Sequence, residues 1–324
     1  MNYRKSSIKQ SIPKELRYTR QQFDREFPTD DACLEQIKEQ RFPGGMAVCE
    51  KCEGPRKHYR VTGRTAFACA TCGNHIYPLA GTIFEKSTTP LRIWFQAMYL
   101  MGSTRCGISA KQIQRETGVT YKTAWRMFRQ IRSLLSEPDM QLEGSTVEVD
   151  EMYYGGRAKN GRGRPMRGDK QKTPVVGAVE RRGRGRVIAR TASDVTMKTL
   201  HGFVKECVLP KSTVFTDEFR SYNGLDQMPE MGYEHKRINH ESKVYVCGDV
   251  HTNTIEGFWS LVKRGIGGVY HSVSQKYLQT YLDEYSFRYN RRASGNLIFP
   301  AMLERVSEKA SSKPSVPVEK IPTV

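Results

Sequence analysis

The sequence lacks any apolar run long enough to cross a membrane, and it is poor in acidic residues. A membrane-spanning helix needs roughly 20 consecutive apolar residues, and neither such a run nor a secretory signal is visible. Lys plus Arg number 52 against 34 Asp plus Glu in 324 residues, so the formal net charge is +18. This excess predicts a polyanionic partner, most simply nucleic acid, with an acidic membrane surface as the alternative.

Cysteine is too sparse for a disulfide framework. Eight cysteines in a chain of this length favour metal binding or free thiols. Four of them form two C-x-x-C pairs, Cys49 with Cys52 and Cys69 with Cys72. Each pair places two thiolates on one tight turn, and four thiolates complete a tetrahedral site for one structural zinc ion.

The segment between these pairs predicts a β-hairpin, with strands at 58–61 and 65–68. Two pairs that flank a hairpin predict a zinc ribbon over 46–80. A redox C-x-x-C is the alternative, but it requires a single motif beside a helix. His58 and His75 are expected at the surface and not among the zinc ligands.

Helical periodicity before and after the ribbon predicts further elements. Residues 1–45 are expected to form a basic arm and a short helix. Within 86–138, two helices broken at Gly118 have Ser109 and Thr120 as N-caps, which is helix-turn-helix spacing. An ordinary helical hairpin with a solvated charged face is the alternative. The candidate DNA-contacting residues on the second helix are Tyr121, Lys122, Thr123, Arg126 and Arg129.

Strands predominate after Glu137-Pro138-Asp139. The pattern predicts three strands, a helix, a strand, a short strand and two helices, in that order, at 146–153, 174–180, 185–191, 196–208, 212–217, 233–238, 250–265 and 274–291. An antiparallel hairpin set joined to parallel strands and covered by helices is a mixed α/β fold.

Two segments of this region predict little regular structure. The Gly-rich basic stretch 154–172 is expected to be a loop that DNA phosphates order, through Arg157, Lys159, Arg162, Arg164 and Arg167. Residues 305–324 are rich in Ser, Pro and Lys, and we expect a disordered tail there.

Three carboxylates are candidate ligands for a divalent metal. Asp150 ends V-E-V-D, Asp217 ends T-V-F-T-D, and Glu256 shares a helix stripe with Asn253 and Lys263. Hard cations take charged oxygen ligands, so these residues predict a metal site. A local capping box between Asn253 and Glu256 is the alternative. The rival ligands are Glu148, Glu151 and Glu218. Strand alternation places Glu148 on the same face as Asp150.

The order of zinc ribbon, helix-turn-helix and Asp…Asp…Glu resembles a cut-and-paste DNA transposase. More narrowly, H-T-N-T-I-E-G-F-W-S-L-V-K-R-G-I and F-R-Y-N-R-R resemble the bacterial insertion-sequence transposases related to eukaryotic Merlin elements, over about residues 30–295. The resemblance implies a multidomain protein whose α/β catalytic domain, residues 144–295, is RNase H-like.

The resemblance also implies the chemistry. Asp150, Asp217 and Glu256 would bind two Mg²⁺ or Mn²⁺ ions, for DNA strand cleavage by water and then strand transfer by a 3′-hydroxyl. Some members of the wider group have Asn and Lys in the third position, which Asn253 and Lys263 match. We expect Glu256 to be the ligand, Asn253 to support the site, and Lys263 with Arg264 to hold DNA phosphate.

The implied partners are transposon ends and target DNA, both double-stranded. The resemblance further implies a homo-oligomer, dimeric on the ends, that is cytoplasmic and nucleoid-associated in a bacterial host. Two other classes are a domesticated DNA-binding regulator, which an intact set of three carboxylates disfavours, and a nuclease of the same fold that cuts without joining.

Overall fold

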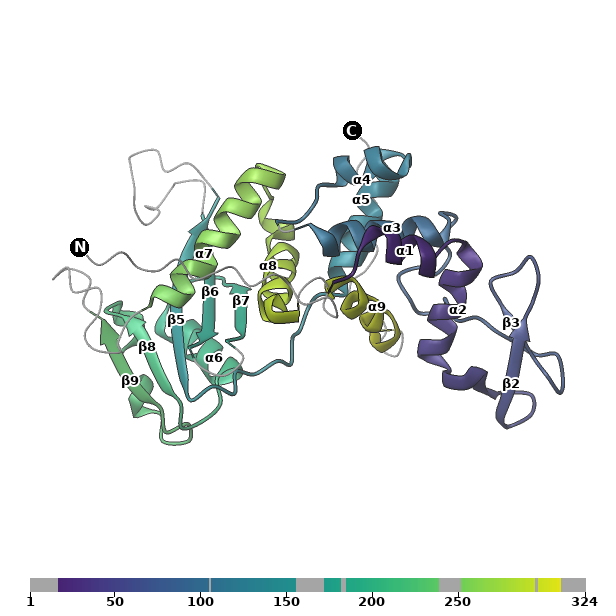
Figure 1. The fold of residues 1–324 in the computed structure, drawn as a ribbon. Helices are drawn as coiled ribbons and strands as arrows, with labels where there is room; N and C mark the ends of the chain where they lie inside the picture. Colours follow the sequence, from purple (N-terminus) through teal and green to yellow (C-terminus); the bar gives the residue numbers. More distant parts are fainter. Residues whose placement is uncertain are drawn as a thin grey trace. The chain divides into compact units, whose positions relative to one another are not determined.

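The computed structural model describes residues 17–104, 106–155, 172–181, 185–238, 252–294 and 297–309. The chain divides into two compact units (Figure 1). The first unit consists of Met1–Leu134 with Ser294–Val324, and the second is Leu135–Ala293. Among the described residues, no helix has the length and apolar character that crossing a membrane requires.

A small antiparallel sheet in the first unit has the strand order β1-β2-β3-β4. Its strands are β1 (Met46–Cys49), β2 (Gly54–Arg60), β3 (Phe67–Cys69) and β4 (His75–Ile76). β2 and β3 form the predicted hairpin, with Arg60 opposite Phe67. The hairpin is the scaffold that brings the two C-x-x-C turns together.

Six α-helices accompany this sheet in the described part of the first unit. They are α1 (Arg20–Glu26), α2 (Asp30–Arg41), α3 (Leu91–Ser103), α4 (Ala110–Thr117), α5 (Tyr121–Ser133) and α9 (Ile298–Lys309), and a 3₁₀ turn spans Pro43–Gly45. The predicted caps are confirmed: Ser109 and Thr120 accept hydrogen bonds from the backbone N–H groups of Gln112 and Thr123. Gly118 ends α4 with a φ of 72°, a conformation in which other residues are strained.

The C-terminal helix α9 returns to the first unit, so the predicted disordered tail is wrong for residues 305–309. Phe299 packs among the rings of Tyr18, Phe23, Phe95 and Tyr99. The apolar residues of α9 recur every three or four positions and are buried. This periodicity is typical of an amphipathic helix, although the residues that follow are polar. The predicted tail beyond Lys309 lies outside the described residues.

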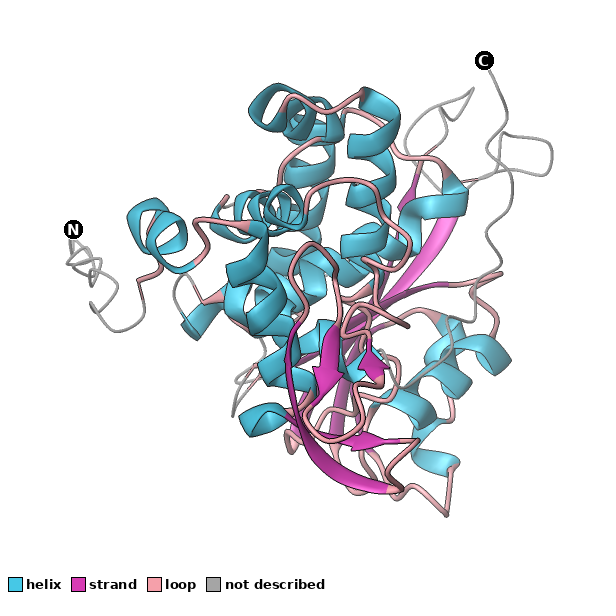
Figure 2. Ribbon diagram, turned by 90° about the vertical axis from the view of Figure 1, so that its right-hand side faces the viewer, coloured by secondary structure: helices cyan, strands magenta, loops and turns pink. Residues whose placement is uncertain are grey.

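The second unit is built on a five-stranded sheet with the order β7-β6-β5-β8-β9 (Figure 1). Figure 2 shows the strands of the protein in magenta and its helices in cyan. Its strands are β5 (Thr146–Tyr154), β6 (Thr173–Glu180), β7 (Val187–Thr191), β8 (Thr213–Asp217) and β9 (Glu234–Ile238). β5, β6 and β7 pair antiparallel, whereas β8 and β9 run parallel to β5. The prediction of a mixed sheet is therefore confirmed.

Helices complete the second unit. They are α6 (Met197–Cys207), α7 (Asn253–Gly265) and α8 (Gln275–Asn290), with a π-helical turn at Ile266–Tyr270 and 3₁₀ turns at Arg220–Tyr222, Leu225–Gln227 and Arg292–Ser294. Alternation along β5 separates two environments, because successive side chains of a strand point to opposite faces. Val147 and Val149 are fully buried in an apolar core with α6, whereas Glu148 and Asp150 face α7.

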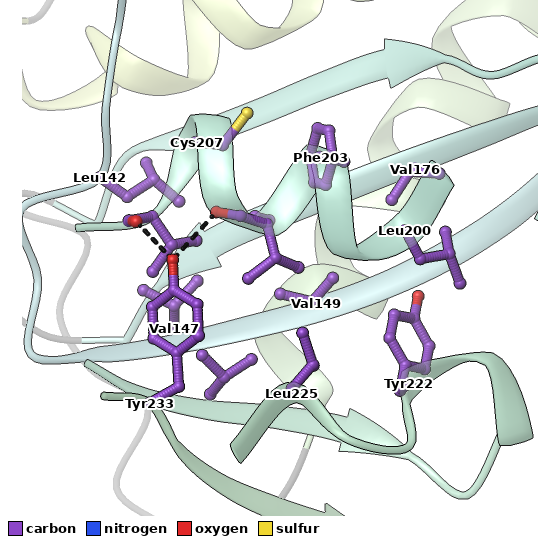
Figure 3. Packing of buried hydrophobic residues seen from close by; sticks show 14 of the residues in the cluster. Leu142, Val147, Val149, Val176, Leu200, Phe203, Cys207, Tyr222, Leu225 and Tyr233 are labelled. Atoms are coloured by element: carbon purple, nitrogen blue, oxygen red, sulfur yellow. Dashed lines mark hydrogen bonds between the residues drawn. The ribbon is translucent and has the colours of Figure 1, made fainter. Parts of the chain in front are cut away.

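The core beneath α6 is almost entirely hydrocarbon (Figure 3). Leu200 and Val204 of α6 contribute to this core together with Leu225 and Tyr233. The hydroxyl of Tyr233 donates hydrogen bonds to the carbonyl oxygens of Val204 and Val208, at 3.3 and 2.8 Å. Its polar atom is thus satisfied inside the core, as burial of a hydroxyl requires.

Helix α8 covers the exposed edge of β7 with two amide side chains. The Asn290 side chain accepts a hydrogen bond from Val187 N–H at 2.7 Å and donates one to the Val187 carbonyl at 3.1 Å. Gln279 bonds the backbone of Thr191 and Ala189 in the same way. Unpaired edge groups favour association with other strands, so these amides both satisfy and protect the edge.

Replacement of Asn290 should therefore destabilise the second unit. Asn290→Ala leaves the part-buried N–H and carbonyl of Val187 without these partners, a loss of about 1–3 kcal/mol of unfolding free energy. Urea unfolding of the full chain measures this loss. Gln275→Ala, at an exposed position of the same helix, is the control and should change stability by less than about 0.5 kcal/mol. Equal stability of the two variants would contradict the role of Asn290.

Candidate active site and zinc centre

Four cysteine thiols converge at one end of the small sheet. Cys49 closes β1, Cys69 closes β3, and the two tight turns that follow carry Cys52 and Cys72. The Sγ atoms of Cys49 and Cys72 lie 3.5 Å apart, those of Cys52 and Cys69 lie 3.9 Å apart, and all four lie within 4.8 Å of one another. The donor set fits tetrahedral zinc with no position left for a substrate, so the centre is structural.

The second turn favours a thiolate at Cys69. The Thr71 backbone N–H points to Cys69 Sγ at 3.5 Å. Although burial acts to raise it, backbone N–H groups of Cys72 and Thr71 lower the pKa of the Cys69 thiol to about 6. Neither His58 nor His75 belongs to the ligand set. The expected surface position of His58 is wrong, since only 4% of it is exposed, and its Nδ1 lies 2.9 Å from the Arg56 carbonyl oxygen.

Removal of one thiol from each turn should abolish zinc binding. Cys49→Ser combined with Cys69→Ser leaves two thiolates, too few to hold the ion, and the ribbon should unfold. Elemental analysis should find about one zinc per parent chain and none in the double variant. Cys106→Ser, at an exposed position outside the cluster, should keep its zinc. Retention of zinc by the double variant would overturn the assignment.

The first turn of α7 is held by a carboxylate from β5. Glu148 Oε2 accepts hydrogen bonds from the backbone N–H groups of Thr254 and Ile255, at 2.8 and 2.9 Å. Glu148 Oε1 accepts from the Thr254 hydroxyl at 2.9 Å and from Arg181 Nε at 2.6 Å. Free N–H groups at a helix start favour a negative charge, so this buried carboxylate acts as a cap supplied by another element.

The local capping box is therefore wrong. The N-cap of α7 is Thr252, one residue earlier than Asn253, and its side chain caps no backbone group. The Thr252 hydroxyl instead donates to Glu256 Oε1 at 3.2 Å. Asn253 is a residue type that often caps helices, but here Glu148 accepts the hydrogen bonds of the first turn and also forms an ion pair with Arg181.

Asp150 lies on the same face of β5, one alternation beyond Glu148. Trp259 Nε1–H donates to Asp150 Oδ2 at 3.0 Å. The indole ring has room because residue 177, opposite Asp150 on β6, is glycine, where a Cβ would lie 2.5 Å from the ring. A buried indole N–H requires a hydrogen-bond partner. The sequence therefore indicates that Trp259 has an acceptor, but it does not identify Asp150 as that acceptor.

Asp150 and Asp217 are neighbours across β5 and β8. The parallel register pairs Glu148 with Phe215. Asp150 and Asp217 each lie two residues further along their strands, and the charge of Asp217 acts on Asp150. Burial, together with the negative charges of Glu151 and Asp217, raises the pKa of Asp150 to about 7. Two half-buried carboxylates that repel one another form a donor set suited to a divalent cation, which would relieve the repulsion.

Glu256 is the third predicted ligand, but its carboxylate does not form a compact cluster with those of the two aspartates. Among the described residues, the only set of three or more ligand atoms within 4.8 Å of one another is the four cysteines. Glu256, Asn253 and Lys263 are exposed along one stripe of α7, as predicted, whereas Ile255, Phe258, Trp259 and Val262 are buried. The two aspartates are thus brought together, and the third ligand remains a prediction.

The rival carboxylates differ in their contacts. Glu148 is fully buried and bonded as described. Glu151 points to the opposite face of β5, where the Tyr222 hydroxyl donates to its Oε2 at 2.9 Å. Glu218 is exposed directly after Asp217. Of these three rival ligands, only Glu218 both adjoins one of the two aspartates in the sequence and has an exposed side chain.

The predicted DNA-contacting residues of α5 lie on its outer side. Tyr121, Lys122, Arg126 and Arg129 are exposed and Thr123 is partly exposed, whereas Ala124 and Phe128 are buried, as is Ile113 of α4. Arg126 Nη2 lies 3.4 Å from Ser87 Oγ. Lys263 and Arg264 are exposed near the end of α7. The loop residues Arg157, Lys159, Arg162, Arg164 and Arg167 lie outside the described residues.

A histidine supports the strand end that carries Asp217. Thr216 Oγ1 donates to the Asp217 carbonyl at 2.7 Å and lies 2.9 Å from His235 Nε2 on β9. Burial and the charge of Arg237 lower the pKa of His235 to about 4. The imidazole is therefore neutral at pH 7, and the contact joins β9 to the end of β8.

Acidification should weaken this support. The folded pKa of His235, about 4, lies below the unfolded value of 6.5, so the unfolded chain binds the proton more tightly. The contribution to stability is present above about pH 6.5 and is lost as the pH falls through about 4. His235→Gln cannot take up this proton, so its melting temperature should fall less than that of the parent between about pH 7 and about pH 4.5. His271→Gln, at an exposed position, should follow the parent, and identical profiles for all three proteins would contradict the assignment.

Two family models match the chain. A transposase zinc-ribbon domain matches residues 28–75, and an ISXO2-like transposase domain matches residues 141–290. A protein of the transposable element ISH50 from Halobacterium salinarum is 32% identical over an alignment 242 residues long, and the alignment covers 71% of this chain and 79% of that protein. A transposase-like protein of Haemophilus influenzae is 33% identical over 97 residues, which are 30% of this chain and 75% of that protein.

The zinc ribbon followed by a mixed α/β domain is that of a transposase. The chain belongs to the family of ISXO2-like transposases, the IS1595 group. The resemblance to insertion-sequence transposases that the motifs predicted is thereby confirmed.

Proposed function

We propose that this transposase cleaves DNA at the ends of an insertion sequence and joins those ends to target DNA, in reactions that require Mg²⁺ or Mn²⁺. The observation that carries the proposal is the closeness of Asp150 on β5 to Asp217 on the neighbouring strand β8. Burial, together with the negative charges of Glu151 and Asp217, raises the pKa of Asp150 to about 7. Such a site is costly for the free protein, and strongly perturbed carboxylates concentrate where chemistry occurs.

The residues would divide the work as follows. Asp150 and Asp217 would hold divalent metal, which activates the attacking oxygen and stabilises the leaving oxygen in phosphoryl transfer. Glu256 would be the third ligand, and Asn253, on the same stripe of α7, would support the site. Lys263 and Arg264, exposed further along this helix, would hold a DNA phosphate near the carboxylates.

The α/β unit supports an RNase H-like assignment for residues 144–295. Three antiparallel strands are followed by two strands parallel to the first, and helices lie on both faces. Asp150 and Asp217 occupy neighbouring central strands, where polar side chains converge. This arrangement agrees with the resemblance from which the metal ligands were predicted.

We assign recognition of the ends to the first unit. α4 and α5 are joined by a short turn at Gly118, and α5 presents Lys122, Arg126 and Arg129 to the outside. This supports a helix-turn-helix whose second helix reads double-stranded DNA. The net charge of +18 is consistent with phosphate contacts over a wide surface. We further propose that two copies of the chain form a homodimer on the paired ends of the element, in the cytoplasm and associated with the nucleoid.

Glu256→Gln tests the chemistry. Glutamine is close in shape to glutamate but is a poor ligand for a hard cation, so 3′-end nicking and joining should be lost in Mg²⁺. Binding of the element's own end DNA and the melting temperature should change little, because Glu256 is exposed and its described hydrogen bond is to Thr252. The measurement is nicked and joined product from labelled end DNA, beside a binding isotherm.

The matched controls are Asn253→Ala, on the same stripe of α7 as Glu256, and Glu218→Gln, directly after the end of β8. If Glu256→Gln cleaves like the parent while Asn253→Ala or Glu218→Gln is inactive, the third ligand is that residue. Cleavage without joining by the parent would identify a nuclease of the same fold. End binding by the parent, with no cleavage in either metal, would identify a DNA-binding regulator.

A further inference from the structure

The contacts of Glu148 leave it no capacity for a metal. An ionised carboxylate has about four acceptor sites. Four donors occupy them: the N–H groups of Thr254 and Ile255, the Thr254 hydroxyl and Arg181 Nε. Glu148 is fully buried, and only 9% of the Arg181 side chain is exposed. A move of Glu148 toward a cation would break these bonds and leave a buried guanidinium without this partner, which is strongly unfavourable.

The same contacts connect two proposed metal ligands. Asp150 lies two residues after Glu148 on the same face of β5, and Glu256 directly follows Ile255 in the turn that Glu148 holds. The Glu256 N–H bonds the Thr252 carbonyl at 3.1 Å, and the Thr252 hydroxyl orients its carboxylate. A displacement of this turn relative to β5 therefore moves Glu256 relative to Asp150.

We propose that the buried Glu148–Arg181 pair is the positioning element of the metal site, which holds the first turn of α7 against β5 and so sets the place of Glu256 without touching the metal. The inference rests on the proposed function, in which Asp150, Asp217 and Glu256 share a divalent cation. Arg181 is itself held in place, because its guanidinium lies 4.2 Å from the centre of the Phe215 ring. The pair thus couples β5, β8 and α7.

Two variants separate a positioning role from a ligand role, because both leave the Glu148 carboxylate intact. Thr254→Val removes one hydrogen bond to Glu148, and Arg181→Met removes its cation. If Glu148 positions α7, both variants should bind Mn²⁺ more weakly, by roughly tenfold to a hundredfold, as for other residues that orient metal ligands. If Glu148 is a ligand, its release should leave Mn²⁺ binding unchanged or tighter.

The control is a second buried carboxylate in the same sheet. Glu180 on β6 is 2% exposed and accepts hydrogen bonds from the N–H groups of Glu143 and Arg186 and from the Arg186 guanidinium. These partners hold loops, not α7. Glu180→Gln should therefore lower stability as Glu148→Gln does, yet bind Mn²⁺ like the parent, whereas Glu148→Gln should lose affinity.

The experiment is a Mn²⁺ titration of the zinc-loaded full chain, combined with amide hydrogen exchange. Exchange at Thr254 and Ile255 should accelerate in Thr254→Val and Arg181→Met and stay slow in Glu180→Gln. Mn²⁺ affinity equal to or above that of the parent in Thr254→Val and Arg181→Met would overturn the proposal. Thr254→Val removes a single hydroxyl and serves as the test if Arg181→Met or Glu148→Gln fails to fold.

Failure of the proposed function has a different signature. A parent chain that binds no Mn²⁺, and that is indistinguishable from Asp150→Asn, contradicts the metal site and the positioning role together. A parent that binds Mn²⁺ through Asp150, with Thr254→Val and Arg181→Met unaffected, contradicts the positioning role alone.

Discussion

The α/β unit depends on one buried charge, the carboxylate of Glu148. A charge removed from water is tolerated only when it is paired and fully hydrogen-bonded. Glu148 meets that condition with donors from two separate places, Arg181 after β6 and the first turn of α7. Because the partners are far apart in sequence, the requirement to satisfy one carboxylate ties a helix, a central strand and the end of the neighbouring strand together.

The central strand β5 serves both stability and function through simple alternation. Val147 and Val149 enter a hydrocarbon core, which contributes the burial that stabilises the unit. On the other face, Asp150 lies close to Asp217, and burial together with nearby negative charge raises the pKa of Asp150. The charged form of Asp150 therefore lowers the stability of the folded state. The glycine at 177 allows the Trp259 indole to bond Asp150, so shape as well as charge is adapted to this face.

The two motifs that carry the family resemblance, one on α7 and one at the end of α8, have different roles. H-T-N-T-I-E-G-F-W lies on α7 and carries the candidate ligand Glu256. F-R-Y-N-R-R, at the end of α8, is devoted to structure: Asn290 satisfies the β7 edge, Arg288 forms a buried ion pair with Glu284, and Arg291 pairs with Glu137. The described contacts of these three residues of the basic motif therefore lie within the α/β unit.

Local chemistry in the sequence determined much of this protein. The two C-x-x-C turns, the caps at Ser109 and Thr120, the αL glycine at 118 and the alternation of β5 depend on neighbours in the chain, so their outcome can be predicted from short segments. The family resemblance came from such motifs as well. The fold class and the candidate aspartates followed from strand patterns and from the rule that hard cations take carboxylates.

The tertiary structure decided what depends on distant partners. The sequence offered a local capping box for α7 as an alternative, but Glu148, more than a hundred positions earlier, bonds the free N–H groups of the first turn. This buried carboxylate satisfies two backbone N–H groups and an arginine at once. Burial of His58, the return of α9 to the first unit and the contact of Trp259 with Asp150 have the same cause. Each depends on which surfaces meet in the folded chain, and no local pattern encodes that.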